Sequence, residues 1–173
     1  MHGERCLATG FLTGMAAGLV AAWAMNQFWA AQSTIEEQLH PSERKQSEQQ
    51  TEQRASDNPT VKVAEAITRP ILGRELAQSE KKTAGSVVHY AFGALMGGFY
   101  GLLSEMMPAA RAAFGTAYGT AVWLGADEGM VPALKLSPPP QESSLSQHLG
   151  GLGAHLVYGA TTEAVRRALR AAA

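Results

Sequence analysis

Hydrophobic and polar residues divide the chain into four apolar stretches and one long polar segment. Residues 7–30 contain no charged side chain, and these 24 residues are enough to cross the roughly 30 Å hydrocarbon layer of a bilayer. Residues 84–106, 110–132 and 145–169 are also strongly apolar, with charges only towards their ends. The pattern predicts an all-α, polytopic membrane protein, a compact bundle of four transmembrane helices in a single membrane domain.

A signal peptide is the alternative for the first stretch. Ala22-Trp23-Ala24 resembles the small-residue site at which such peptides are cleaved. However, the apolar run is longer than the usual core of a signal peptide, and Asn26, Gln27 and Trp29 are typical of a helix end at the membrane interface. We therefore expect the first helix to be retained.

The polar segment, residues 32–83, is expected to be a long loop after the first helix. Its first part, residues 32–58, can either continue that helix into water or remain disordered. Asn58-Pro59-Thr60 is a helix-start signal, and Pro70 interrupts the apolar pattern that follows. That pattern predicts a short amphipathic helix on the membrane or on the bundle. Its apolar positions are Val61, Ala64, Ile67, Ile71 and Leu72.

Glycine is concentrated in the apolar stretches, which hold sixteen of the eighteen glycines. In a soluble bundle, at about 1 kcal/mol each, they would cost on the order of 16 kcal/mol, more than the usual total stability of about 5–15 kcal/mol. In a bilayer the backbone bonds internally regardless, and glycine lets helices approach closely. A membrane bundle is therefore favoured over a soluble Ala/Gly-rich one. The predicted packing ridges, spaced by four or eight residues, are Gly10, Gly14, Gly18, Gly93, Gly97, Gly101, Gly115, Gly119, Gly151 and Gly159.

Composition removes several classes of function. The net charge is −1, so the basic footprint of a nucleic-acid-binding protein is missing. Cys6 is the single cysteine, so an intrachain disulfide is impossible, and neither cysteine metal spacing nor a phosphate-binding glycine loop occurs. No nucleophile–base spacing stands out. We expect no cofactor, no metal and no enzymatic activity.

Ionisable residues within the apolar stretches are the candidates for function, because they are costly in a membrane. Antiparallel helices place them in two layers. One layer holds Asn26, His89, Asp127, Glu128 and His148, and the other holds Glu105, Arg111, Glu163, Arg166 and Arg167.

His155, seven residues after His148 and about 10 Å deeper, is the best candidate near the middle of the membrane. Each of these residues has a structural alternative, such as hydrogen bonding between helices. Glu163 in particular can pair with Arg166 or Arg167 one turn further on. A metal site would require His89 and Asp127 to converge with a histidine of the last stretch.

The second half of the chain resembles a known family. The resemblance covers about residues 84–170 and rests on VHYAFGALMGGFYGLLSEMMP, on the SPPP loop and on AHLVYGATTEAVRRALR. These motifs are similar to those of the YagU-like family of uncharacterised bacterial inner-membrane proteins. The resemblance implies a location in the bacterial inner membrane and supplies neither an activity nor a substrate.

The positions of the arginines help to predict on which side of the membrane the termini lie. The arginines on the side of both termini, together with the resemblance, favour cytoplasmic termini, although the opposite side also carries basic residues. The arginines on the terminal side are Arg5, Arg111, Arg166, Arg167 and Arg170.

Two functions fit the sequence. The first is a scaffold, accessory or stress-related membrane protein whose partners are the lipid bilayer and either a second copy or another membrane protein. The second is a proton- or ion-linked channel, transporter or pH sensor in which His89, Asp127 and His155 line a wet cavity.

Overall fold

The computed structural model describes residues 2–39 and 58–172, and these residues form helices joined by short turns. The long helices are α1 (His2–Leu39), α4 (Gln78–Met106) and α7 (Leu145–Ala172). This architecture confirms the predicted all-α class. The shorter elements are α3 (Pro59–Leu72), η2 (Pro108–Gly115), α5 (Thr116–Val122), η3 (Trp123–Met130), α6 (Val131–Ala133) and η4 (Pro140–Glu142).

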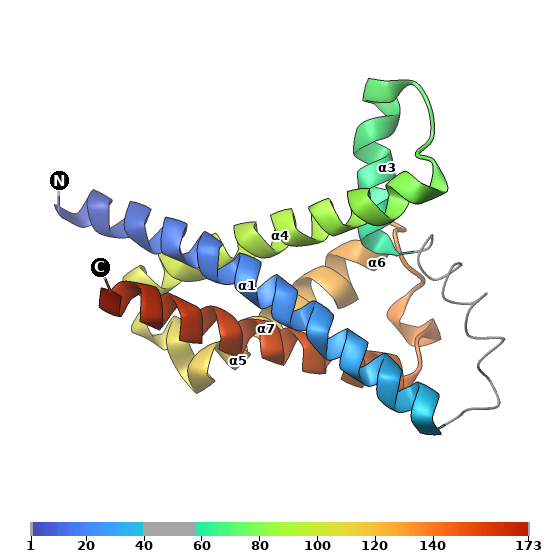
Figure 1. Ribbon diagram of the computed structural model, residues 1–173. Coiled ribbons are helices and arrows are strands. Elements are labelled where there is room, and N and C mark those ends of the chain that lie inside the picture. The colour runs from blue at the N-terminus through green and yellow to red at the C-terminus, as the bar shows by residue number, and fades with distance from the viewer. Residues whose placement is uncertain (1, 40–57, 173) are drawn as a thin grey trace.

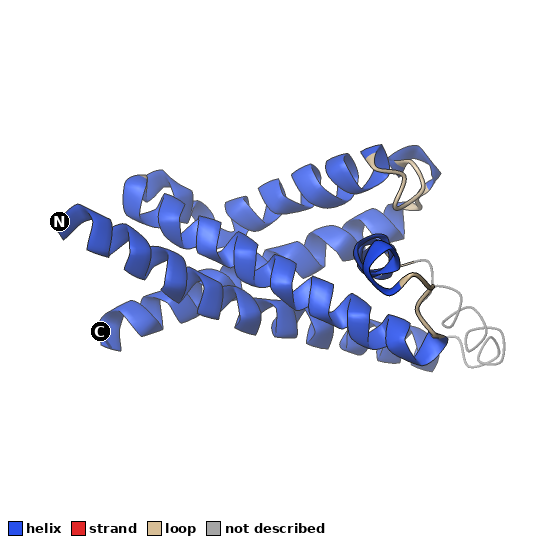
Figure 2. Ribbon diagram, turned by 90° about the horizontal axis from the view of Figure 1, so that it is seen from above, coloured by secondary structure: helices blue, strands red, loops and turns tan. Residues whose placement is uncertain are grey.

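The long helices cross one another so that both chain ends lie at the same end of the bundle (Figure 1). A view turned by 90° shows the same arrangement, with the N- and C-termini side by side (Figure 2). Helix α1 packs against α4 and α7, α5 packs against α7, and α3 packs against α4. The end of the bundle that holds the termini is here called the terminal end, and the end beside α3 is called the α3 end.

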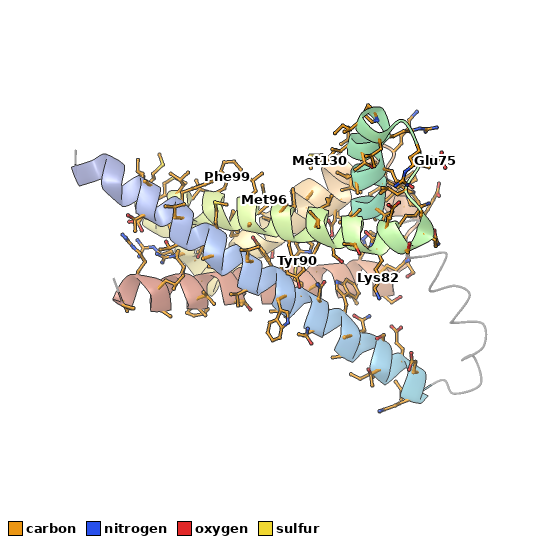
Figure 3. All side chains as sticks on the ribbon, turned by 45° about the horizontal axis from the view of Figure 1, so that its top comes forward. Glu75, Lys82, Tyr90, Met96, Phe99 and Met130 are labelled. Atoms are coloured by element: carbon orange, nitrogen blue, oxygen red, sulfur yellow. The ribbon has the colours of Figure 1, made fainter. Side chains whose placement is uncertain are left out.

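Two of the helices are long and apolar enough to cross a membrane, judged by length and composition: Leu7–Leu39 within α1, and α4 over Gln78–Met106. Only 33% of the most apolar window of each is buried inside the protein. Large apolar side chains therefore face outwards, including Leu12, Trp23 and Phe99, and Figure 3 shows Phe99 among the side chains along α4. Such exposed apolar surface is typical of lipid contact rather than of a helix at the centre of a soluble core.

The glycines of α1 pack directly on those of α4. A Cβ atom added to Gly14 would meet the backbone of Gly97 and Gly101, and one added to Gly18 would meet Gly93 and Gly97. The two backbones are thus in contact with no side chain between them, as the glycine ridges predict. Because these contacts lie within one chain, the ridges hold this bundle together.

A second glycine contact joins α5 to α7. Gly115 and Gly119 face the backbone of Gly159 and His155. Gly151 differs from the other predicted ridge positions, because its neighbour is the indole of Trp123 and not a backbone. Its lack of a side chain makes room for that aromatic ring.

The third apolar stretch departs from the expected helix over residues 110–132, because regular helix begins six residues later, at Thr116. Ala113 and Phe114 adopt left-handed φ angles of 48° and 55°, and Gly115 has a φ of 82°. The reason is that the chain must reverse between Met106, where α4 ends, and the antiparallel helix α5. A helix starting at Ala110 would leave too few residues for that reversal.

The same stretch widens into a π-helix, η3, where Val131 N–H donates to the Ala126 carbonyl five residues back. Pro132 follows immediately. Proline has no N–H to donate, and its ring clashes with the carbonyl four residues earlier in a regular α-helix. Widened turns before Pro132 relieve that clash, and π-helical segments are frequent at functional sites.

Helix α3 starts at the predicted signal, with the Asn58 side chain accepting a hydrogen bond from Thr60 N–H at 3.0 Å. Val61 and Ala64 are buried, whereas Ile67 and Ile71 are exposed. The expected amphipathic helix thus lies on the bundle, against the start of α4. The first part of the polar segment continues α1 as far as Leu39, and residues 40–57 lie outside the described residues.

Replacing Gly97 with alanine should destabilise the bundle by about 1–3 kcal/mol, because the added methyl group overlaps the backbone of Gly14 and Gly18. The measurement is SDS-induced unfolding of the purified protein. Gly125→Ala is the matched control, since an added Cβ there meets nothing within 4 Å. Equal stability of the two variants would contradict direct backbone packing.

Candidate functional site

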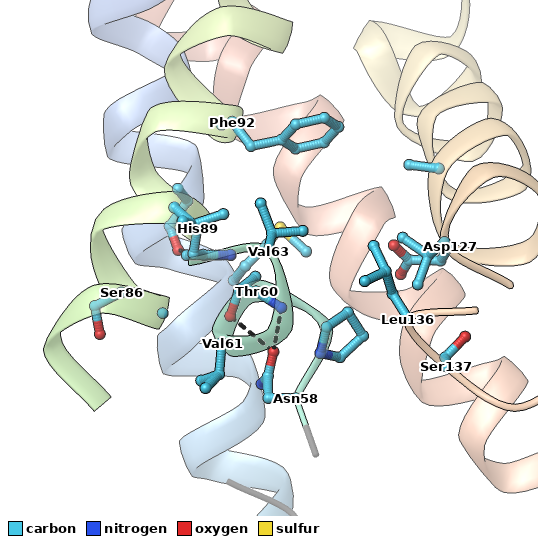
Figure 4. Close-up of a pocket in the computed structure, with 18 of the residues that line it drawn as sticks. Asn58, Thr60, Val61, Val63, Ser86, His89, Phe92, Asp127, Leu136 and Ser137 are labelled. Atoms are coloured by element: carbon cyan, nitrogen blue, oxygen red, sulfur yellow. Dashed lines mark hydrogen bonds between the residues drawn. The ribbon is translucent and has the colours of Figure 1, made fainter. Parts of the chain in front are cut away.

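A cavity of about 800 Å³ opens between α1, α3, α4, η3 and α7. Residues from all five elements line it, and Figure 4 shows His89 of α4 and Asp127 of η3 on opposite sides, with Val63 of α3 between them in the view. Most of the wall is apolar. Its polar and ionisable lining residues are Asn26, Asn58, Thr60, Lys82, Ser86, His89, Asp127, Ser137, His155 and Tyr158.

His89 joins α4 to α1 across the cavity wall. Its Nε2 lies 3.2 Å from the Ala22 carbonyl oxygen. Since a carbonyl only accepts hydrogen bonds, Nε2 carries the hydrogen, and Nδ1 is the acceptor nitrogen of the neutral ring. His89 is therefore both a bond between helices and a base in the cavity wall.

His155 is 7% exposed and lies beside Asp127. Its Nδ1 donates to the Gly151 carbonyl at 2.9 Å and is 3.7 Å from Asp127 Oδ2. By the same reasoning, Nε2 is the acceptor nitrogen of the neutral ring. The Asp127 carboxylate is half-exposed, so it is accessible from the cavity side of this pair.

His148 and Glu128 form a separate pair. His148 Nδ1 is 2.8 Å from Glu128 Oε1, and Nε2 is 3.0 Å from the Pro140 carbonyl oxygen. The pair ties the start of α7 to η3 and to the proline-rich loop. Neither residue lines the cavity, so the expected layer of Asn26, His89, Asp127 and His148 divides into cavity residues and one loop-bracing pair.

All four tyrosines make hydrogen bonds between helices, and the sequence analysis did not single them out. Tyr158 donates to the Gly93 carbonyl at 2.6 Å, and Tyr118 donates to the Met96 carbonyl at 2.7 Å. Tyr100 donates to Glu163, and Tyr90 accepts from Asn26. The presence of tyrosine in the apolar stretches could have predicted these bonds, because a buried hydroxyl requires a hydrogen-bond partner.

The terminal end of the bundle holds an ion cluster around Glu163, which is completely buried. Glu163 accepts hydrogen bonds from Tyr100, Arg166 and Arg167, so the predicted pairing along α7 is present. Glu105 of α4 lies 3.0 Å from Arg170 and 3.9 Å from Arg166. The cluster thus joins α4 to α7, and none of its residues lines the cavity. Arg111, expected at the same level, is exposed in the η2 turn.

Within the described part of the chain, no three His, Cys, Asp or Glu side chains are grouped so that they could hold a metal ion. His89, Asp127 and His155 line the same cavity, but two of their nitrogens are committed to backbone carbonyls. The cavity wall instead presents one carboxylate and two imidazole acceptor nitrogens, which lie beside aromatic and apolar side chains.

Fold and site together define a helical-bundle protein with two helices able to cross a membrane and a cavity lined by ionisable residues. A family model matches residues 31–164, and the chain belongs to that family, described as protein of unknown function (DUF1440). No curated protein and no solved structure matches the chain.

Replacing Glu163 with alanine should destabilise the protein by about 3–5 kcal/mol, because the buried Arg166 guanidinium loses its carboxylate partner. SDS-induced unfolding measures the change. The control is Glu75→Ala, which removes a pair with Arg69 whose side chains are both 71% exposed and should cost at most about 1 kcal/mol. A Glu163→Ala effect as small as that of Glu75→Ala would show that the cluster is not a stabilising link.

Proposed function

We propose that this protein is a four-span protein of the bacterial inner membrane, with α1, α4, the η2–α6 segment and α7 as its spans. The apolar outer surfaces of α1 and α4 support this proposal, as does the resemblance to YagU-like inner-membrane proteins. Glycine contacts join α1 to α4 and α5 to α7, which is the close packing that membrane helices use. The η2–α6 segment would cross as part of this bundle, packed against α7 on one side.

The function we propose is proton-linked binding of a small solute, that is, a membrane pH sensor or solute sensor. The observation that carries it is that His89, Asp127 and His155, from three different elements, line one cavity. Each imidazole can take up a second proton, and protonation of either ring would add positive charge to the cavity. The other titratable groups of the lining are Lys82 and Tyr158.

We favour binding over conduction because direct contacts join the helices on the terminal side of the cavity. Beyond Met96 and Tyr158, which line the inner part of the cavity, the tyrosine–carbonyl bonds, the glycine contacts and the Glu163 cluster fill the space between helices. The cavity thus resembles a binding site that is open on one side.

The proposed proton linkage predicts a change in the environment of Trp29, which lines the cavity. The protein is first made with Trp29 as its single tryptophan by Trp23→Phe and Trp123→Phe. Its emission should be quenched and shifted to longer wavelength as the pH is lowered, because protonated imidazoles would draw water into the cavity. Fluorescence titration in detergent micelles measures the transition.

The transition should disappear in the double variant His89→Gln/His155→Gln and persist in His148→Gln, whose ring lies outside the cavity. An unchanged transition in the double variant would refute the proposed role of the two rings. A cavity without any pH response would favour the second candidate, an accessory or scaffold protein. The exposed Ile67, Ile71 and Leu72 of α3 support that candidate, because this helix is too short to span a bilayer and still presents apolar residues outwards.

We propose that both termini are cytoplasmic, since they share one end of the bundle with the arginine-rich end of α7. Alkaline phosphatase fused to the C-terminus should therefore be inactive, and a fluorescent protein fused there should be bright. Phosphatase activity of the C-terminal fusion would show that the termini lie on the opposite side of the membrane. Fusion after Ser137, in the loop before α7, is the control and should give the opposite pattern.

A further inference from the structure

We propose that the ligand of this cavity is an organic cation with an apolar body. This inference rests on the proposed function, because it assigns a ligand class to the same site. The first observation is the charge of the inner wall. Asp127 is the one carboxylate of the described lining, and His89 and His155 each add an acceptor nitrogen when neutral.

The second observation is the aromatic and apolar character of the same wall. Phe92, Trp29 and Tyr158 line the cavity, and Figure 4 shows Phe92 on the side of α4. Aromatic faces attract cations, most strongly when water is excluded. The remaining apolar wall includes Met25, Met96, Met130 and Val63. A ligand with a delocalised or shielded positive charge and an apolar body matches both parts of this lining.

Two alternatives fit less well. A small metal ion needs several converging ligands, and within residues 2–39 and 58–172 no such group of three exists. An anion would be repelled by the negatively charged carboxylate of Asp127. Lys82, the one cationic side chain of the lining, is seven residues before His89 on α4, which places it about 10 Å away along the helix, towards the mouth.

The probe for this proposal is tetraphenylphosphonium, a cation with an apolar body, compared with tetraphenylborate, an anion of matching size and shape. Equilibrium dialysis against the full-length protein in detergent micelles gives the dissociation constants after subtraction of protein-free micelles. We expect tetraphenylphosphonium to bind at least about tenfold more tightly than tetraphenylborate at pH 8, because only the cation is attracted by Asp127.

Asp127→Asn should weaken binding of the cation by about tenfold or more, and Asp127→Glu, which keeps the charge, should retain it. Glu128→Gln is the matched control. It removes a neighbouring carboxylate that faces His148 outside the cavity, and it should weaken binding of the cation far less than Asp127→Asn does. Equal binding of the two probes, or wild-type affinity in Asp127→Asn, would overturn the proposal.

The two proposals fail in different ways. If the Trp29 emission responds to pH through His89 and His155 but tetraphenylphosphonium does not bind, the ligand class is wrong and the proton linkage stands. If the cation binds through Asp127 without a pH response of Trp29, the site binds cations but is not proton-linked. The tests therefore judge the ligand and the linkage separately.

Discussion

Backbone contact between glycine ridges is the constraint on which the rest of this structure depends. At Gly14, Gly18, Gly93 and Gly97 the two helices α1 and α4 touch without intervening side chains. This proximity brings the Ala22 carbonyl of α1 within reach of His89 on α4. Gly93 of α4 also leaves room for Tyr158 of α7, which donates to its carbonyl. Hydrogen bonds between the helices are thus a consequence of the close packing, and they fix how the helices are oriented relative to one another.

The cavity begins where this contact ends. Gly93 and Ala22 are in contact with each other and also line the cavity, and beyond them α1 and α4 diverge towards the α3 end (Figure 1). Helix α3 fills part of the resulting space by packing Val61 against Gly85. The terminal end has the opposite character, because Glu163 and its arginines close it with buried charge. One bundle therefore has a closed end and an open end, and the ionisable lining residues of the proposed site lie in the open one.

Much of this fold could be predicted from the sequence because glycine spacing, apolar length and helix-start signals act locally. Asn58 and Pro59 start α3 as expected, and α7 begins at Leu145 as expected. The break after α4 at Pro108 could be predicted, but the turn at Ala112–Gly115 could not, since it arises from the need to reverse the chain between packed helices. The π-helical turns before Pro132 likewise depend on how the proline is accommodated.

For the candidate site, the sequence indicated which residues were unusual, and the structure was needed to group them. His89, Asp127 and His155 were identified by their presence in apolar stretches, yet their convergence depends on the rotation of three helices. His148 was expected with them and instead pairs with Glu128, because the loop around Pro140 lies against it. The tyrosine bonds depend on the same rotations.

The order of elements along the chain also has a consequence for biosynthesis. Among the described helices, α1 is synthesised before its glycine partners on α4, which follow only after the long polar segment, and α7, which contacts both α1 and α5, comes after them. The glycine ridge of α1 therefore has no partner until α4 has been synthesised. Tyr158 and Glu163, which bond to α4, are contributed by the last helix. The native contacts of α1 and α4 are therefore complete only after α7 has been synthesised.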